Sequence, residues 1–245
     1  MSGHSKWANI KHKKGKTDAV RGKITTKISR EITIAVKMGG PDPVGNMKLK
    51  LALSKAKANN VPKDNIQRAI SKGSGVQDGT KYEEITYEGY GASGVAVMVS
   101  ALTDNRNRTA ADVRHLFSKY SGNLGETGSV NWMFKKKGII VIENEEEQYD
   151  EDEVLMIALE AGAEDLKVED GTFEIIAEPS EFENVEKALT DNVIEIAMSE
   201  ITQIPDNMME VSEEDALKIQ KLVETLEDLD DVEDVYTSAN LPDEE

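Results

Sequence analysis

The chain has 245 residues, no cysteine and a formal net charge of −18 at neutral pH. The absence of cysteine excludes disulfides, thiolate zinc sites, iron–sulfur clusters and cysteine nucleophiles. No stretch approaches the ~20 apolar residues that a transmembrane helix needs, and no apolar segment typical of a secretory signal follows the charged N-terminus. We therefore expect a cytoplasmic protein without a membrane partner.

The charge is divided unevenly along the chain. Residues 1–80 contain 17 Lys and Arg against 5 Asp and Glu, a net charge of +12. Residues 81–245 contain 12 against 42, a net charge of −30. Such asymmetry is typical of a polyanion-binding segment joined to an acidic body. The basic segment must dominate any contact with nucleic acid, because the acidic body repels a phosphate backbone.

The basic segment, residues 1–80, is predicted to be an arm followed by a small helical bundle. Residues 1–16 lack apolar periodicity and are too rich in cations to pack, so we expect a flexible arm that an anion orders. Apolar residues recur at helical spacing over 20–38 and 44–59, and a shorter helix is expected between Pro62 and Gly73. In the second helix the residues expected to face inward are Met47, Leu51 and Ala58.

From Tyr82 onward the pattern is that of an α+β protein. Strand-like alternation and helical periodicity follow one another, and Asp170-Gly171 is a strong signal for a tight hairpin. We expect two ferredoxin-like domains after the helical module, one inserted into the other. The outer domain is assigned to 81–135 and 200–245, and the inserted domain to 136–199.

Two glycine-rich stretches invite a phosphate-binding interpretation. Gly89-Tyr-Gly-Ala-Ser-Gly94 matches G-x-G-x-x-G, but a strand rather than a helix is expected after it, which favours a hairpin loop over a dinucleotide site. Gly122-Asn-Leu-Gly-Glu-Thr-Gly128, followed by Lys135-Lys-Lys137, lacks the Gly-Lys-Ser/Thr of a P-loop. A structural loop is the preferred interpretation of this stretch, with a phosphate cradle as the alternative.

Candidate nucleic-acid contacts are the cations, and the one tryptophan, of the arm and the first helix. They are His4, Lys6, Trp7, Lys11, Lys13, Lys14, Lys16, Arg21, Lys23, Lys27 and Arg30. A second cationic group follows Asp104 and offers either an anion or partner contact or a solvated face, with Asp112 placed to pair with Arg108. This group is Arg106, Arg108, Arg114, His115 and Lys119.

Evidence for catalysis is thin. His4 and His12 lie in the arm, and His115 lies more than a hundred residues away. The carboxylate clusters resemble solvated surface rather than an organised metal site, and no nucleophile, base and oxyanion donor come together. We expect a non-enzyme that uses no cofactor, metal or small-molecule substrate.

Several short motifs together resemble the YebC/PmpR family over the whole chain. They are Met1-Ser-Gly-His-Ser-Lys-Trp7, Arg21-Gly-Lys23, Lys27-Ile28, Arg30-Glu31, Asp104-Asn-Arg-Asn-Arg-Thr109, Val113-Arg-His115, Gly122-Asn-Leu-Gly125, Gly128-Ser-Val130 and Phe134-Lys-Lys-Lys-Gly138. Ala92 departs from the family, which often carries Pro there. The resemblance implies a helical module and two α+β domains.

The function that the resemblance implies has two forms. Bacterial members are described as DNA-binding transcriptional regulators, whereas other relatives look like translational activators or ribosome-associated factors that relieve stalling at proline-rich stretches. A basic module with an arm suits ribosomal RNA or tRNA, where shape and phosphate density matter. We therefore favour a ribosome-associated translation factor. A DNA-binding regulator stays open, because the third helix offers polar side chains that a recognition helix uses.

Overall fold

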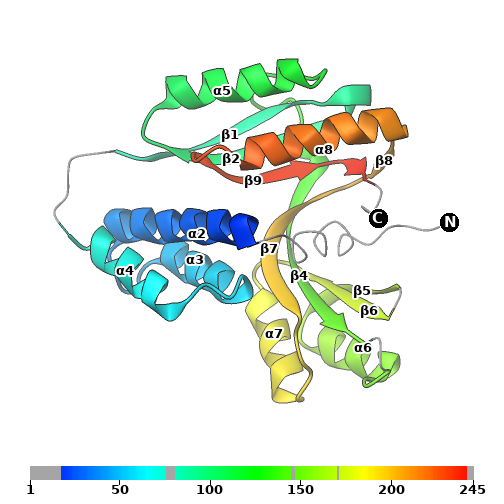
Figure 1. Cartoon of the computed structure of the whole chain (residues 1–245). Coiled ribbons are helices and arrows are strands. Elements are labelled where there is room, and N and C mark those ends of the chain that lie inside the picture. The colour runs from blue at the N-terminus through cyan, green and yellow to red at the C-terminus, as the bar shows by residue number, and fades with distance from the viewer. Residues whose placement is uncertain (1–17, 76–80, 145–146, 170, 242–245) are drawn as a thin grey trace. The chain divides into compact units, whose positions relative to one another are not determined.

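The computed structural model describes residues 18–75, 81–144, 147–169 and 171–241. They form two compact units, Lys135–Ile204 and the described residues of Gly15–Phe134 and Pro205–Glu245. Each unit contains both helices and an antiparallel sheet, which confirms the α+β class (Figure 1).

The larger unit begins with three helices, α2 (Asp18–Gly39), α3 (Met47–Ala58) and α4 (Lys63–Gly73). Both shorter helices contact α2, and Figure 1 shows them side by side. The buried residues of this bundle lie at helical spacing on α2 and α3, and the turn before α4 and α4 itself add one each. They are Ile28, Ile32, Ala35, Val36, Leu49, Ala52, Ala56, Val61 and Ala69.

The predicted inward face of α3 is wrong. Met47 is 63% exposed and Leu51 is 39% exposed, whereas Leu49 and Ala52 are fully buried. The helix begins three residues later than expected because Asn46 caps it: the Asn46 side chain accepts from the Leu49 amide (3.1 Å) and donates to the carbonyl of Ala35 (2.8 Å). These contacts fix the rotation of α3 and turn its alanine-rich side toward α2.

The same unit contains a four-stranded antiparallel sheet in the order β3-β1-β2-β9. Its elements are β1 (Glu83–Tyr90), β2 (Ala96–Thr103), α5 (Arg106–Lys119), β3 (Asn123–Leu124), α8 (Glu213–Glu227) and β9 (Val232–Thr237). Phe117 of α5 and Leu222 of α8 belong to the core against the sheet. The spatial order of the strands matches that of a ferredoxin-like sheet. The chain order differs, because β1 precedes β2 and a hairpin joins the two strands directly.

The other unit contains the β-α-β-β-α-β series expected of the inserted domain. Its elements are β4 (Phe134–Glu143), α6 (Glu151–Glu160), β5 (Ala163–Glu169), β6 (Thr172–Ala177), α7 (Phe182–Asp191) and β7 (Met198–Pro205). The sheet order is β5-β6-β4-β7, the order of a ferredoxin-like fold. Gly138 of β4 lets α7 approach closely, since a Cβ there would lie 2.3 Å from the Phe182 ring.

The remaining elements are short. They are the 3₁₀ turns η1 (Ala92–Gly94) and η2 (Asn131–Met133) and the paired strands β8 (Met209–Glu210) and β10 (Ala239–Asn240). Across the described ranges, no helix is long and apolar enough to cross a membrane.

Candidate nucleic-acid interface

The predicted contact residues fall into three groups in the structure. Those of the arm, from His4 to Lys16, lie outside the described residues. Arg21 belongs to α2, although its side chain is also outside the described part. Lys23, Lys27 and Arg30 are described, and we call them the α2 stripe. The sequence predicts them as nucleic-acid contacts, and the structure places them against carboxylate and carbonyl groups of the same chain.

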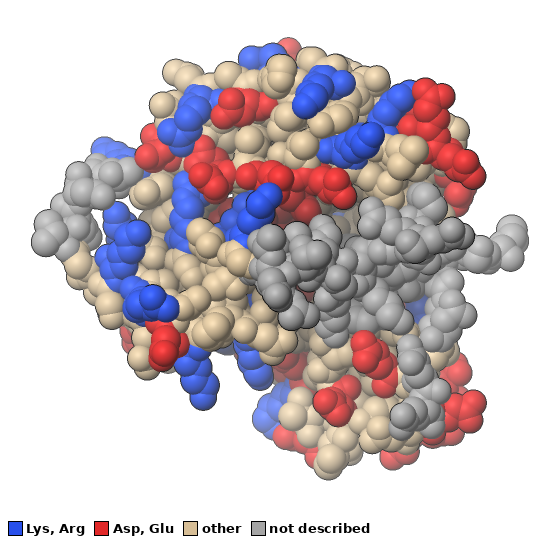
Figure 2. Space-filling view, viewed as in Figure 1, with Lys and Arg blue, Asp and Glu red and all other residues tan. Residues whose placement is uncertain are grey.

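The α2 stripe contacts an acidic segment of the same unit, which we call the acidic edge (residues 227–234, six of them Asp or Glu). Lys23 Nζ lies 2.9 Å from the Asp228 carboxylate. Lys27 Nζ donates to the carbonyl oxygens of Glu227 and of Val232, the latter at 2.9 Å. Arg30 donates to the Asp231 carboxylate at 2.8 Å. Figure 2 shows Lys and Arg of the helices lying against this acidic surface.

A fourth cation of the helices extends this contact. Lys55 of α3 lies 3.0 Å from the Asp234 carboxylate and 3.5 Å from that of Glu31. Burial alone lowers the pKa of Lys55, but Asp234 and Glu31 outweigh it and raise the pKa above its ordinary value. The ammonium group therefore stays charged, and the contact is a true ion-pair network.

The carboxylates of this network are crowded. Burial raises the pKa of Glu31. Burial, followed by the charge of Glu31, raises the pKa of Glu233 to about 7. Burial also lowers the pKa of Lys27, against the opposing effect of Glu227 and Asp228. These three side chains lie where the helices meet β9, and their pKa values are shifted there. The free energy of this contact therefore depends on pH.

Asp231 is the centre of the acidic edge. One carboxylate oxygen accepts from Arg30, and the other accepts from Arg108 (2.7 Å), Thr109 Oγ1 (2.8 Å) and Thr103 Oγ1 (3.1 Å). Burial alone raises the pKa of Asp231, but the hydrogen bonds from Arg108 and the threonines lower it below its usual range. Asp231 thus joins α2, β2 and α5 at one buried carboxylate.

The second predicted cationic group is divided by this arrangement. Arg108 forms ion pairs with Asp104 (2.9 Å) and with Asp231. The sequence predicted Asp112 as its partner instead. Arg106 lies 3.7 Å from Glu83. Arg106 and Arg108 are exposed despite these pairs, and so are the other three members, Arg114, His115 and Lys119. An anion or partner contact at these three residues stays a prediction.

The glycine-rich stretches are loops. Gly89–Gly94 joins two antiparallel strands through η1, which confirms the hairpin interpretation and contradicts a dinucleotide site, since β2 rather than a helix follows. The other stretch ends at Gly128. The amides of Gly128 and of Val130 and Asn131 just after it each donate to the Glu88 carboxylate at 2.8 Å. A buried carboxylate therefore occupies the place where a phosphate would bind.

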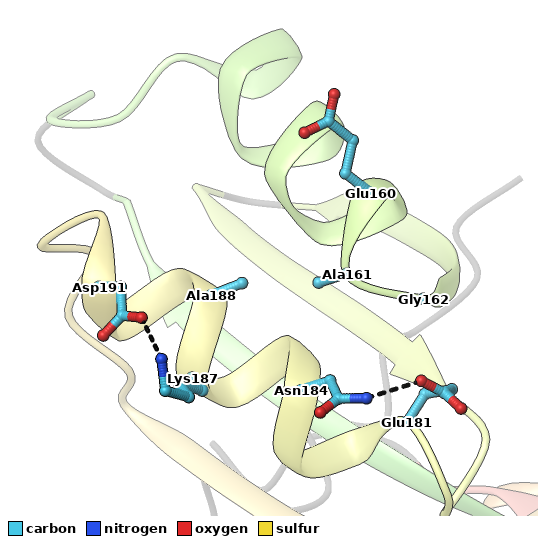
Figure 3. A pocket seen from close by; sticks show the side chains of 8 residues that line it. All are labelled: Glu160, Ala161, Gly162, Glu181, Asn184, Lys187, Ala188 and Asp191. Atoms are coloured by element: carbon cyan, nitrogen blue, oxygen red, sulfur yellow. Dashed lines mark hydrogen bonds and ion pairs between the residues drawn. The ribbon is translucent and has the colours of Figure 1, made fainter.

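A shallow pocket lies between α6 and α7 (Figure 3). Its polar side chains bind one another: Lys187 pairs with Asp191 at 2.5 Å, and Asn184 donates to Glu181 at 2.9 Å. No cluster of three or more metal-ligating side chains occurs among the described residues. The pocket offers no group that is poised for chemistry.

The acidic edge is the feature that sequence reasoning missed. The charge run alone assigns no partner to its six carboxylates, because it does not reveal which cations fold onto it. The sequence did contain a signal for this contact. A dense acidic run lies near the end of a chain whose first 80 residues carry a net charge of +12. The fold and these contacts define a multidomain α+β protein whose basic helical module packs on an acidic edge of its own body.

Comparison with known proteins identifies the family. Residues 5–76 match the family described as TACO1/YebC protein N-terminal domain, and residues 82–239 match that described as TACO1/YebC second and third domain. The chain belongs to the TACO1/YebC family.

Related proteins are similar in sequence to this chain over almost its whole length. A protein from Desulforamulus reducens is 54% identical over 97% of this chain and 98% of its own, and one from Clostridium tetani is 55% identical over 100% and 99%. Both are named "Probable transcriptional regulatory protein". A crystal structure of a conserved hypothetical protein from Aquifex aeolicus matches with a TM-score of 0.81, at 44% identity over 98% of both chains.

Proposed function

We propose that this protein is a non-enzymatic regulator of gene expression that binds RNA on the ribosome and assists translation. The observation that carries the proposal is the concentration of a net +12 in residues 1–80 beside a body of −30. Only the basic part is attracted to a phosphate backbone, so the protein is suited to contact nucleic acid at one end.

The small size of the available basic surface favours a folded RNA. The α2 stripe is neutralised in part by the acidic edge, which leaves the outer helices and the arm for contact. A compact basic surface suits local contact with the phosphates and 2′-hydroxyls of a folded RNA. Along duplex DNA, where a charge recurs every ~1.7 Å, the acidic body meets repulsion on either side of that contact.

The second candidate is a DNA-binding transcriptional regulator. The outer side of α4 presents Gln67 and Arg68 to solvent, and these are residue types that read base edges in the major groove. The printed names of the relatives point the same way. This candidate requires α4 to enter the groove as a recognition helix.

Sedimentation of a nuclease-treated lysate separates the two candidates. We expect the full-length protein to travel with ribosomal particles through a sucrose gradient at low salt and to be released at high salt. Release from DNA by deoxyribonuclease, with none of the protein in the ribosomal fractions, contradicts the translation proposal and supports the regulator of transcription.

A further inference from the structure

The outer surface of α4 and the end of α3 carry cations that are more available to a ligand than those of the α2 stripe. We call these cations the α4 face: Arg68 and Lys72 lie four residues apart on one side of α4, and Lys57 and Lys63 flank the turn between α3 and α4. All four side chains are exposed. None of them forms an ion pair with any carboxylate that the structure describes. Arg68 donates to two neutral acceptors, the Asp64 carbonyl (3.2 Å) and the Asn65 side-chain oxygen.

The chain segment that carries this face is mostly cationic, although Lys48 and Lys55 within it pair with Glu84 and Asp234. Residues 43–75 contain seven Lys and Arg and a single acidic residue, Asp64. A backbone of phosphates approaching here meets little repulsion, whereas at the α2 stripe it competes with six carboxylates of the acidic edge. Moving the acidic edge aside also breaks the contact of Arg30 with the Asp231 carboxylate and that of Lys27 with the Val232 carbonyl. Binding at α4 has no such cost.

The α4 face is also fixed in shape. The inner side of α4 lies directly against α2, since a Cβ at Gly73 would lie 2.6 Å from the Thr33 carbonyl oxygen and 2.7 Å from Val36. Thr33 Oγ1 donates to the Ala69 carbonyl at 3.2 Å. A rigid helix backbone loses little conformational freedom on binding, so the points from which its cations project are fixed, whereas the exposed lysine side chains still lose rotamer freedom.

From these observations we infer that the α4 face binds the phosphate backbone of RNA, and that the α2 stripe serves mainly to hold the helical module on the acidic edge. This inference rests on the proposed function and assigns its contact surface. The occupant is a folded or duplex RNA, because charge complementarity requires a polyanion and a short convex helix face matches a local run of phosphates.

The test compares two full-length variants that lose the same charge. One replaces Lys63, Arg68 and Lys72 by Ala on the α4 face, and the control replaces the exposed Lys136, Lys187 and Lys221 by Ala elsewhere. The probe is a fluorescent RNA duplex of about 20 base pairs, titrated at several KCl concentrations beside a DNA duplex of the same sequence. Circular dichroism and urea unfolding show whether each variant keeps its fold.

The α4 variant is expected to bind RNA about 10- to 100-fold more weakly than the wild type at ~100 mM KCl. Its slope of log affinity against log salt should fall by about 2 to 3, close to one for each phosphate that the variant no longer neutralises. The control variant should stay within about twofold of the wild type. Equal RNA affinity of the folded α4 and control variants overturns the inference, and so does tighter binding to DNA than to RNA.

The outcomes also separate this inference from the proposed function. Ribosome sedimentation of the wild type that persists in the α4 variant leaves the proposed function in place and removes this face from it. Failure of the wild type to travel with ribosomes removes the proposed function itself.

Discussion

Asp231 shows how one residue ties sequence segments together. Its carboxylate accepts hydrogen bonds from Arg30, Arg108, Thr103 and Thr109, and the residue is 8% exposed. A buried carboxylate is stable only when its oxygens are satisfied in this way. Arg108 is therefore a structural residue, which the sequence alone presented as a candidate for an anion site.

Replacing Asp231 by Asn should lower the free energy of unfolding by about 2–4 kcal/mol at neutral pH, because two arginines lose their shared charge partner. The folded pKa of Asp231 lies below its unfolded value. Its stabilisation is therefore present above pH ~4 and is lost as the pH falls through the folded pKa. Urea unfolding of both proteins at neutral and acid pH measures this. A difference that does not shrink in acid contradicts the role assigned to the charge.

Glu233 should behave in the opposite way. Its pKa in the folded protein is raised to about 7, first by burial and then by Glu31, so the folded protein binds a proton more readily than the unfolded chain. Ionisation of Glu233 above pH 7 therefore costs stability, and lowering the pH toward ~4.5 restores it. Glu233→Gln should gain about 1–2 kcal/mol at pH ~8 and almost nothing at pH ~4.5, as urea unfolding measures. Equal effects at both pH values would argue against the raised pKa.

At the scale of elements, close packing of α4 on α2 gives the helical module its shape. Gly73→Ala should lower the free energy of unfolding by about 1–3 kcal/mol, because the added methyl group meets the Thr33 carbonyl and Val36. Gly22→Ala in α2 is the matched control: nothing lies within 4 Å of a Cβ there. That change should stabilise the helix by about 0.5–1 kcal/mol. Chemical denaturation followed by circular dichroism compares them, and a loss no larger at Gly73 than at Gly22 would count against this packing.

Much of the element series could be predicted from the sequence. Hydrophobic periodicity located α2 and α4, a strand was expected where β2 follows Gly94, and the Asp170-Gly171 signal located the β5–β6 hairpin, since each signal is local. The inward face of α3 could not be predicted, because its alanine and leucine residues leave the period ambiguous and the cap at Asn46 decides the rotation. The Val232 carbonyl that Lys27 contacts and the Asp231 carboxylate that Arg108 contacts lie more than a hundred residues away, and no local pattern carries that information.

At the level of the whole molecule, the basic α2 stripe and the acidic edge, which are far apart in the sequence, contact each other within one unit. Replacing the three residues of the α2 stripe by Ala should lower the free energy of unfolding by about 1–3 kcal/mol, mostly through Arg30 and Lys27, since the exposed Lys23–Asp228 pair contributes little. The same loss of charge at Lys136, Lys187 and Lys221 should change it by less than about 0.5 kcal/mol. Differential scanning calorimetry makes the comparison. Equal unfolding temperatures for the two triple variants would show that the acidic edge does not hold the stripe.

Action on translating ribosomes is the function that we propose for this protein. Ribosome profiling beside RNA sequencing after rapid depletion tests it most directly. We predict that ribosome occupancy rises within particular coding sequences, proline-rich ones first, before transcript levels change. Unchanged occupancy together with prompt changes in the transcripts of genes that share a DNA site would contradict the claim.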